Sequence, residues 1–136
     1  MRSYYLTEES FNLRGAIFEV HKQLGAGFLE SVYQEALAIE LAKRRIPYQV
    51  NEMIQVCYKD IPLSKGFISD FVCYSKIILE IKAVKSIDDI HRAQLLNYLK
   101  ASGYKLGFLV NFHSYPKVHI ERFIHGVKLV TQEHED

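Results

Sequence analysis

Acidic and basic side chains interrupt two short apolar segments near the middle of the chain. Asp70 lies in the run 67–74, and Glu80 and Lys82 lie in the run 76–82. Both runs are typical of β-strands, in which alternate side chains point to opposite faces, so Glu80 and Lys82 share one face. Charged residues seldom lie inside a sheet unless they are paired or hold a metal. These residues are therefore the first candidates for chemistry.

A hairpin turn at residues 74–76 is predicted to join the two strands. With Ser75 at the centre of this turn, Asp70 and Glu80 lie at equal separations on either side and therefore face each other. Directly opposed residues have Cβ atoms about 5 Å apart, and like charges at that spacing are destabilising. Two carboxylates held together beside Lys82 predict a divalent-cation site.

Hydrophobic spacing predicts the elements that position these residues. Thr7 is expected to cap a first helix that ends at Gly25, and a second helix is expected over residues 29–45. A capping box in residues 86–89 is expected to open a third helix that ends near Gly103. Strands are expected at residues 48–58, 67–74, 76–82, 106–112 and 118–124. The predicted fold class is α/β, an α+β sandwich in the order ααβββαββ with a central mixed sheet flanked by helices.

Length and composition narrow the class of protein. The chain has 136 residues, 49% of them hydrophobic, which predicts a single domain over residues 1–136. No apolar run approaches the roughly 20 residues of a membrane-spanning helix, so no membrane partner is expected. Cys57 and Cys73 lack metal-ligand spacing, which favours reduced thiols and a cytoplasmic location. A net charge of +1 neither supports nor excludes nucleic acid as a partner.

Two of the predicted helices carry further polar candidates. Gln94 and Tyr98 are four residues apart in the third helix and therefore share a face. A polar edge on an amphipathic helix is the simpler explanation for this pair, but the helix begins soon after Lys82 and must pack near Glu80. Glu30 lies in the first turn of the second helix, where an acidic residue also stabilises the helix dipole.

Read in order, these elements resemble a known superfamily. Asp70 followed by Glu80-Ile81-Lys82 resembles the PD-(D/E)xK nuclease motif. Gln94-x-x-x-Tyr98 resembles the QxxxY element of the RecB-like branch of that superfamily. The Glu80-Ile81-Lys82 triplet alone is weak evidence for this superfamily, whereas all the elements in the same order along the chain are specific to it.

A further element lies near the start of the second helix. Gly27-x-x-Glu30-x-x-Tyr33 is similar to the motif of the GxxExxY proteins, a family assigned to the same superfamily. The resemblance extends from Leu13 to about Phe123. Ser69 departs from the motif, which often has proline before the aspartate.

The resemblance implies a restriction-endonuclease-like core and a Mg²⁺-dependent or Mn²⁺-dependent nuclease that hydrolyses DNA or RNA through a metal-activated water. It implies metal ligands at Asp70, Glu80 and Glu30 and at the backbone carbonyl of Ile81. Lys82 is then expected to orient or activate the water and to offset charge on the scissile phosphate. Gln94 and Tyr98 are expected to position the phosphate or the lysine.

Two other functions remain open on the sequence. The first is a module that binds nucleic acid or protein through the same fold without significant catalysis. The second is a metal hydrolase that uses the same carboxylates on a small phosphoester. A homodimer formed through a free edge at residues 123–130 is a further expectation. The sequence does not distinguish DNA from RNA or endonuclease from exonuclease cleavage.

Overall fold

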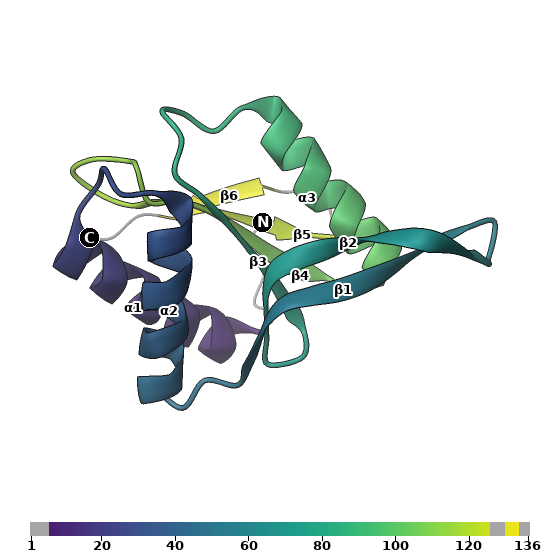
Figure 1. Ribbon diagram of the computed structural model, residues 1–136, viewed down its shortest axis with the longest axis horizontal. Coiled ribbons are helices and arrows are strands. Elements are labelled where there is room, and N and C mark those ends of the chain that lie inside the picture. The colour runs from purple at the N-terminus through teal and green to yellow at the C-terminus, as the bar shows by residue number, and fades with distance from the viewer. Residues whose placement is uncertain (1–5, 126–129, 134–136) are drawn as a thin grey trace.

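The computed structural model describes residues 6–125 and 130–133 of the chain. Within these residues two helices precede three strands, and a third helix precedes three more strands (Figure 1). The elements are α1 Thr7–Leu24, α2 Glu30–Lys43, β1 Tyr48–Tyr58, β2 Ile61–Cys73, β3 Ile77–Lys82, α3 Asp89–Ser102, β4 Leu106–Asn111, β5 His119–Ile124 and β6 Val130–Glu133. The predicted order ααβββαββ is confirmed as far as β5, whereas β6 was not predicted.

One mixed sheet organises the molecule, with its strands side by side in the order β1-β2-β3-β4-β5-β6. The β3–β4 pair is parallel, and the other neighbouring pairs are antiparallel. Parallel neighbours need a crossover connection, and α3 supplies it between β3 and β4. The predicted central mixed sheet is therefore confirmed, and the fold is the restriction-endonuclease-like α+β class.

The two faces of the sheet are covered by different helices (Figure 1). Side chains of α1 and α2 pack on one face in a large hydrophobic cluster that includes Ile77, Leu79 and Ile81 of β3. A smaller cluster joins Ile78 of β3 to Leu95 of α3 on the other face. The alternation predicted for β3 is confirmed, because side chains at odd and even positions belong to different clusters.

The β2–β3 hairpin has the predicted register. Cys73 pairs with Ile77, and Phe71 pairs with Leu79. The backbone N–H of Lys76 donates to the carbonyl of Cys73 at 3.1 Å, which closes the turn. The two central residues of the turn both have positive φ, 57° at Tyr74 and 55° at Ser75. Positive φ at both central positions matches the twist of hairpin strands.

The far side of the sheet differs from the expectation of a free edge at residues 123–130. Val130 of β6 pairs with Phe123 of β5, so β6 covers the edge of β5. Residues 126–129 of that segment lie outside the described residues. The homodimer remains a prediction, without the free β5 edge on which it was based.

Two helix starts also differ from the prediction. Thr7 is the first residue of α1 rather than its cap, and Leu6 precedes it with φ of 52°. The capping box of α3 forms between Asp88 and His91 rather than from Ser86, since the N–H of Asp88 donates to His91 Nδ1 at 3.0 Å. No helix in the described part of the chain is long and apolar enough to cross a membrane.

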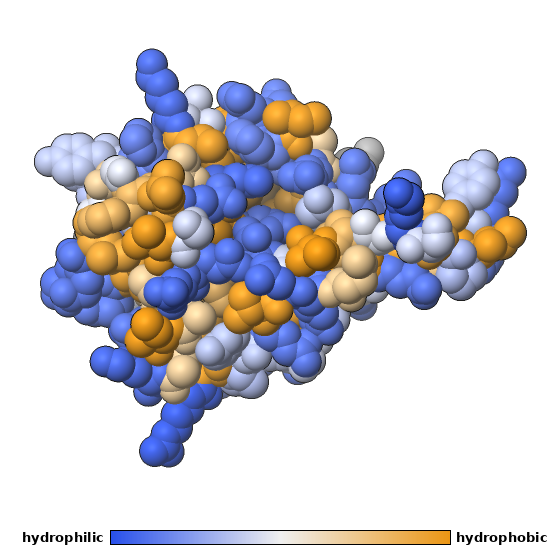
Figure 2. Space-filling view, in the orientation of Figure 1, coloured by the Kyte–Doolittle hydropathy of each residue, from blue (hydrophilic) through white to orange (hydrophobic). Residues whose placement is uncertain are grey.

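The β1–β2 hairpin extends as an arm beyond the body of the molecule (Figures 1 and 2). The first strand, β1, has its predicted bounds, whereas β2 is longer than predicted because it begins at Ile61 instead of residue 67. Apolar side chains along the arm are exposed, among them Met53, Tyr58 and Ile61. Both cysteines are free: Cys57 is exposed on the arm, and burial raises the pKa of the Cys73 thiol to about 12.

Candidate active site

Asp70 and Glu80 lie side by side where β2 and β3 separate. The N–H of Asp70 donates to Glu80 Oε2 at 3.3 Å, and the N–H of Ile81 donates to Asp70 Oδ2 at 2.7 Å. The backbone pairing of β2 with β3 ends at Phe71 and Leu79. Beyond this point the carboxylate oxygens of Glu80 and Asp70 accept the backbone N–H groups of Asp70 and Ile81 instead. The expected proximity of the two acidic residues is therefore observed.

The electrostatics of this pair are unfavourable without a cation. Glu80 is only 8% exposed. Its burial raises the pKa of the carboxyl group to about 8, and the neighbouring charge of Asp70 adds to this rise. Lys82 lowers the same pKa but does not cancel these effects. A buried like-charge pair of this kind holds a proton or a cation between its members.

Glu30 approaches this pair from the first turn of α2. Its side chain is open to solvent overall, but partial burial of the carboxyl group raises its pKa. The positive charge of Lys82 lowers that pKa, the charge of Asp70 raises it, and a hydrogen bond from the N–H of Ala83 lowers it. Glu30 therefore lies within electrostatic reach of both Lys82 and Asp70, although α2 and β3 are distant in sequence.

Tyr33 explains structurally why Glu30 occupies this place. Its ring is fully buried and stacks on Phe112 with 4.6 Å between ring centroids. The Tyr33 hydroxyl donates to the carbonyl of Gly25 at 2.5 Å and accepts the N–H of Phe28 at 3.2 Å. One side chain thus holds the loop between α1 and α2 that delivers Glu30 to the site.

Helix α3 covers the site from above the sheet. Tyr98 stacks on Phe67 of β2 with 3.7 Å between centroids and 4° between ring planes. Burial raises the pKa of Tyr98, the charges of Glu80 and Asp70 raise it further, and a hydrogen bond with Gln94 lowers it. The structure therefore brings Gln94 and Tyr98 together, and it brings Tyr98 within reach of the carboxylate pair.

Asn111 of β4 was not identified from the sequence, although it is 2% exposed and lies beside Lys82 in the parallel pair. Its Oδ1 accepts the N–H of Val84 at 3.1 Å, and its Nδ2 donates to the Val84 carbonyl at 2.8 Å. The N–H of Phe112 donates to the carbonyl of Lys82 at 2.9 Å. These bonds hold the chain as it leaves Lys82.

Glu121 of β5 is a second buried carboxylate that sequence reasoning missed. Arg92 of α3 binds it through both oxygens, with Nε–Oε1 at 2.6 Å and Nη2–Oε2 at 2.8 Å. His119 Nε2 lies 2.7 Å from Glu121 Oε2. Burial raises the pKa of Glu121, but Arg92 and His119 hold it below its ordinary value. A charge inside an apolar strand was the available signal, the same one that identified Glu80.

A divalent cation fits part of this arrangement. The described residues contain no group of three or more His, Cys, Asp and Glu side chains in position to hold a metal, so Glu30 is not gathered with Asp70 and Glu80 into one cluster. The Asp70–Glu80 pair itself offers hard oxygen donors with unbalanced charge. Mg²⁺ binds commonly through one or two carboxylates and keeps several waters, so this pair suits it.

Comparison with known proteins agrees with this geometry. No curated protein and no solved structure matches the chain. A family model described as the PD-(D/E)XK nuclease superfamily matches residues 7–123. That range includes both carboxylates of the pair, Lys82 and the helix that covers them. The chain belongs to the PD-(D/E)XK nuclease superfamily.

Proposed function

We propose that this protein is a divalent-metal-dependent nuclease that hydrolyses phosphodiester bonds in DNA or RNA. The observation that carries the proposal is the Asp70–Glu80 pair, in which Glu80 is buried and Asp70 half-buried, with Lys82 on the same face of β3. Membership of a nuclease superfamily supports the reaction class. Phosphodiester hydrolysis depends mainly on positioning and charge stabilisation, and these three residues supply both.

In this proposal Asp70 and Glu80 hold Mg²⁺ or Mn²⁺, with Glu30 and the backbone carbonyl of Ile81 as further oxygen donors. A bound divalent cation supplies positive charge at the phosphate and acidifies water. The raised pKa of Glu80 makes the pair a receptor for positive charge, because binding releases the proton that the pair otherwise retains.

Lys82 places an ammonium group beside the pair. Its positive charge offsets the charge that develops on the scissile phosphate, and its N–H groups orient the attacking water. Glu30 restrains the ammonium electrostatically from α2. Gln94 and Tyr98 act from α3, where their hydrogen bond sets the direction of the phenol toward the phosphate or the lysine.

We also infer that the chain belongs with the GxxExxY proteins of the RecB-like branch. The contacts of Tyr33 with the loop before α2 give its spacing from Glu30 a structural role, and Gly27 in that loop has a φ of 109°. Gln94 and Tyr98 support the branch assignment. Both hydrophobic clusters pack on one sheet, which supports the prediction of a single domain.

The proposal is tested by cleavage of labelled DNA and RNA, single and double stranded, with Mg²⁺, Mn²⁺ or EDTA. Glu80→Gln and Lys82→Ala should each abolish cleavage, whereas Lys100→Ala on the exposed part of α3 should leave it unchanged. Calorimetry should show Mn²⁺ binding by the wild type and by Lys82→Ala, and none by Glu80→Gln. Cleavage that persists in both site variants would come from a contaminant and would refute the assignment.

A second function has one observation in its favour. Since no three-ligand cluster is present among the described side chains, the fold could serve as a binding module without significant catalysis. Such a module would bind oligonucleotides in a salt-sensitive and EDTA-insensitive manner, with no turnover over the whole substrate panel. Turnover of a small phosphodiester without oligonucleotide binding would instead indicate a metal hydrolase that acts on a small phosphoester.

A further inference from the structure

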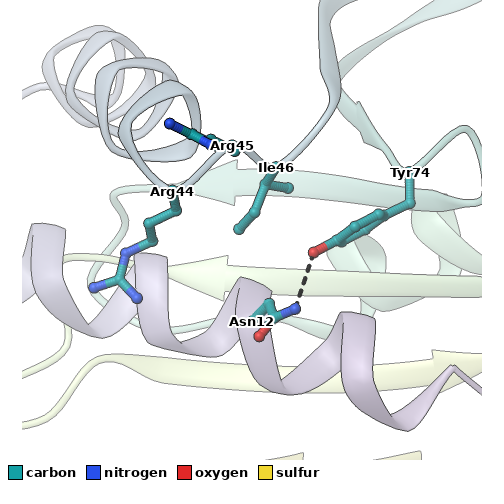
Figure 3. A pocket seen from close by; sticks show the side chains of 5 residues that line it. All are labelled: Asn12, Arg44, Arg45, Ile46 and Tyr74. Carbon is teal, nitrogen blue, oxygen red and sulfur yellow. Dashed lines mark hydrogen bonds between the residues drawn. The ribbon is translucent and has the colours of Figure 1, made fainter.

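A cavity of about 370 Å³ lies near the beginning of β3, away from the carboxylate pair. It is bordered by α1, the end of α2 and the β2–β3 turn and open to solvent, and its lining residues are Asn12, Arg44, Arg45, Ile46 and Tyr74 (Figure 3). Lys82 is at the other end of β3, five residues beyond Ile77 and about 17 Å along the strand. The cavity is therefore separate from the candidate active site.

The polar walls of the cavity are rich in hydrogen-bond donors. Arg44 and Tyr74 lie on opposite sides with Ile46 between them, and the Arg45 side chain extends from the end of α2 away from Tyr74 (Figure 3). Asn12 Nδ2 donates to the Tyr74 hydroxyl at 3.2 Å, which fixes one wall. The Arg44 guanidinium across from an amide and a phenol, with the charge of Arg45 added from the end of α2, suits a phosphate, whose oxygens accept N–H donors.

Arg44 is held in place by a neighbour that leaves much of its fork available. Its Nε lies 2.7 Å from Glu40 Oε2, one turn earlier in α2, and the Arg44 side chain is 39% exposed. This contact employs Nε and orients the guanidinium across α1. The Glu40 carboxylate thus acts as a support for Arg44 at the rim of the cavity.

Gly15 of α1 makes room for this guanidinium. Glycine in the interior of a helix is less favourable than alanine. A Cβ at position 15 would lie 3.0 Å from Arg44 Nη1, so alanine there would shift the guanidinium by a few tenths of an ångström. Gly15 therefore makes α1 less stable than alanine would, and it leaves space for the Arg44 guanidinium where this side chain crosses α1.

Arg45 is the converse case, a residue with a side chain at a position where glycine is favoured. It adopts a φ of 58° just after α2, and the N–H of the next residue, Ile46, donates to the carbonyl of Leu41 at 3.0 Å. This is the left-handed residue that ends a helix, a position where glycine is favoured. Gly15 occupies a position that suits alanine and Arg45 one that suits glycine; Gly15 adjoins the Arg44 side chain, and Arg45 lines the cavity.

We propose that this cavity is a binding site for a phosphate monoester. Arg44 and Arg45 supply the charge, Asn12 and Tyr74 the neutral polar wall, and Ile46 an apolar surface for the group that bears the phosphate. Its volume lies in the range of small-molecule pockets, which begins at roughly 300 Å³, so it accommodates more than the phosphate alone. Free phosphate and a nucleoside monophosphate share this chemistry.

The test is calorimetric titration of the full chain with inorganic phosphate and with AMP. The titrations are done in EDTA and in the Lys82→Ala background, so that the carboxylate site contributes nothing. Saturable binding is expected, and Arg44→Ala and Arg45→Ala should each weaken it by roughly tenfold or more. Lys43→Ala removes an exposed charge next to the cavity and should leave the affinity unchanged. Absence of saturable binding of both ligands overturns the proposal.

Gly15→Ala and Arg45→Gly provide a sharper test, because both are expected to preserve or raise the melting temperature. Both should nevertheless weaken phosphate binding, severalfold for Gly15→Ala and roughly tenfold for Arg45→Gly. Unchanged affinity in both variants would show that the cavity is not the site and would overturn the proposal. Tighter binding of AMP than of phosphate identifies a nucleotide ligand, whereas equal binding identifies phosphate, and each supports a phosphate site.

This inference does not rest on the proposed nuclease function. Neither metal nor turnover enters the titration, and the variants lie outside the candidate active site. Loss of nuclease activity in Glu80→Gln would leave the cavity result untouched. Likewise, failure of phosphate binding at Arg44 and Arg45 would leave the nuclease assignment unaffected.

Discussion

Glu80 and Glu121 occupy equivalent places on the sheet but have opposite electrostatic surroundings. Each pairs directly with Leu109, Glu80 through the parallel β3–β4 pair and Glu121 through the antiparallel β4–β5 pair. Both are buried, at 8% and 0% exposure. Glu80 adjoins another carboxylate, and its pKa is raised to about 8, whereas Arg92 and His119 hold the pKa of Glu121 below its ordinary value.

The difference separates a structural charge from a reactive one. The chain itself supplies the partners of Glu121, so this carboxylate fastens α3 to β5 at no further electrostatic cost. The Asp70–Glu80 pair has too little positive charge around it within the described residues, even with Lys82 near. Under the proposed function, a cation from solution completes that balance, which is the property that a metal-dependent site needs.

The largest expected effect comes from removing each charge in turn. Glu121→Gln leaves Arg92 without its buried partner and should lower the free energy of unfolding by about 3 kcal/mol. Glu80→Gln replaces a carboxyl group that is largely protonated at pH 7 without metal, because its pKa is raised to about 8, and should therefore leave stability nearly unchanged. Urea denaturation at pH 7 in EDTA measures both. Asp89→Asn is the control, since its exposed contact with Arg92 is worth about 0.5 kcal/mol or less. An equal loss in Glu80→Gln would contradict the distinction.

Metal addition should act on one carboxylate and not on the other. At a Mn²⁺ concentration about 100 times the dissociation constant, the wild type should gain about 2.7 kcal/mol of stability. Glu121→Gln should gain the same increment from its lower starting value, because its substitution leaves the pair intact. Thermal unfolding with and without Mn²⁺ gives the comparison. A full gain in Glu80→Gln would place the metal elsewhere.

The two carboxylates should also give opposite pH dependence in metal-free protein. The folded-state pKa of Glu80 is raised, so folded protein binds more protons and stability falls as pH rises from about 4.5 to about 8. The slope from this group is at most about 1.4 kcal/mol per pH unit.

Glu121 has a lowered pKa in the folded protein, so its contribution to stability is lost as the pH falls below the ordinary pKa of a glutamate. Denaturation from pH 3 to 9 should lose the first slope in Glu80→Gln and the second in Glu121→Gln. Persistence of both slopes would assign them to other groups.

The smallest expected stability change is at Tyr98, which adjoins the Glu80 side of the face. Tyr98→Phe keeps the stack on Phe67 and removes the hydroxyl group, so stability should change by about 1 kcal/mol or less. Nuclease activity should fall by more than this stability change explains. Tyr98→Leu, which also removes the stack, should cost about 1 kcal/mol more. Full activity in Tyr98→Phe would restrict Tyr98 to a packing role.

The region around β3 was predictable because its signals are local. Period-two alternation separates Ile78, Glu80 and Lys82 from the other face, and a turn centred on Ser75 sets the hairpin register. Both depend on residues close in sequence, so they hold before any helix packs on the sheet. The same local pattern did not reveal that β4 pairs with β3 in parallel, nor which helices pack on each face of β3.

Other parts were missed for identifiable reasons. The four residues of β6 are stabilised by pairing with β5, which hydrophobic periodicity in so short a segment does not reveal. The start of α3 depends on whether Ser86 or Asp88 caps the helix, and both are good N-cap residues. Asn111 has no local signal, because its importance comes from hydrogen bonds to Val84, which is 27 residues away.

The sequence by itself determined which charges lie within apolar strands and which of them share a face. It therefore predicted the Asp70–Glu80 pair, but it identified no role for Glu121. Tertiary structure decided which charges are compensated, because Arg92 reaches Glu121 from a helix 29 residues away in the chain. Side-chain alternation is a property of neighbouring peptide units, whereas charge balance depends on every element that packs against the group. That balance leaves the charge of the Asp70–Glu80 pair uncompensated by Lys82 alone, and the proposed function assigns a cation to it.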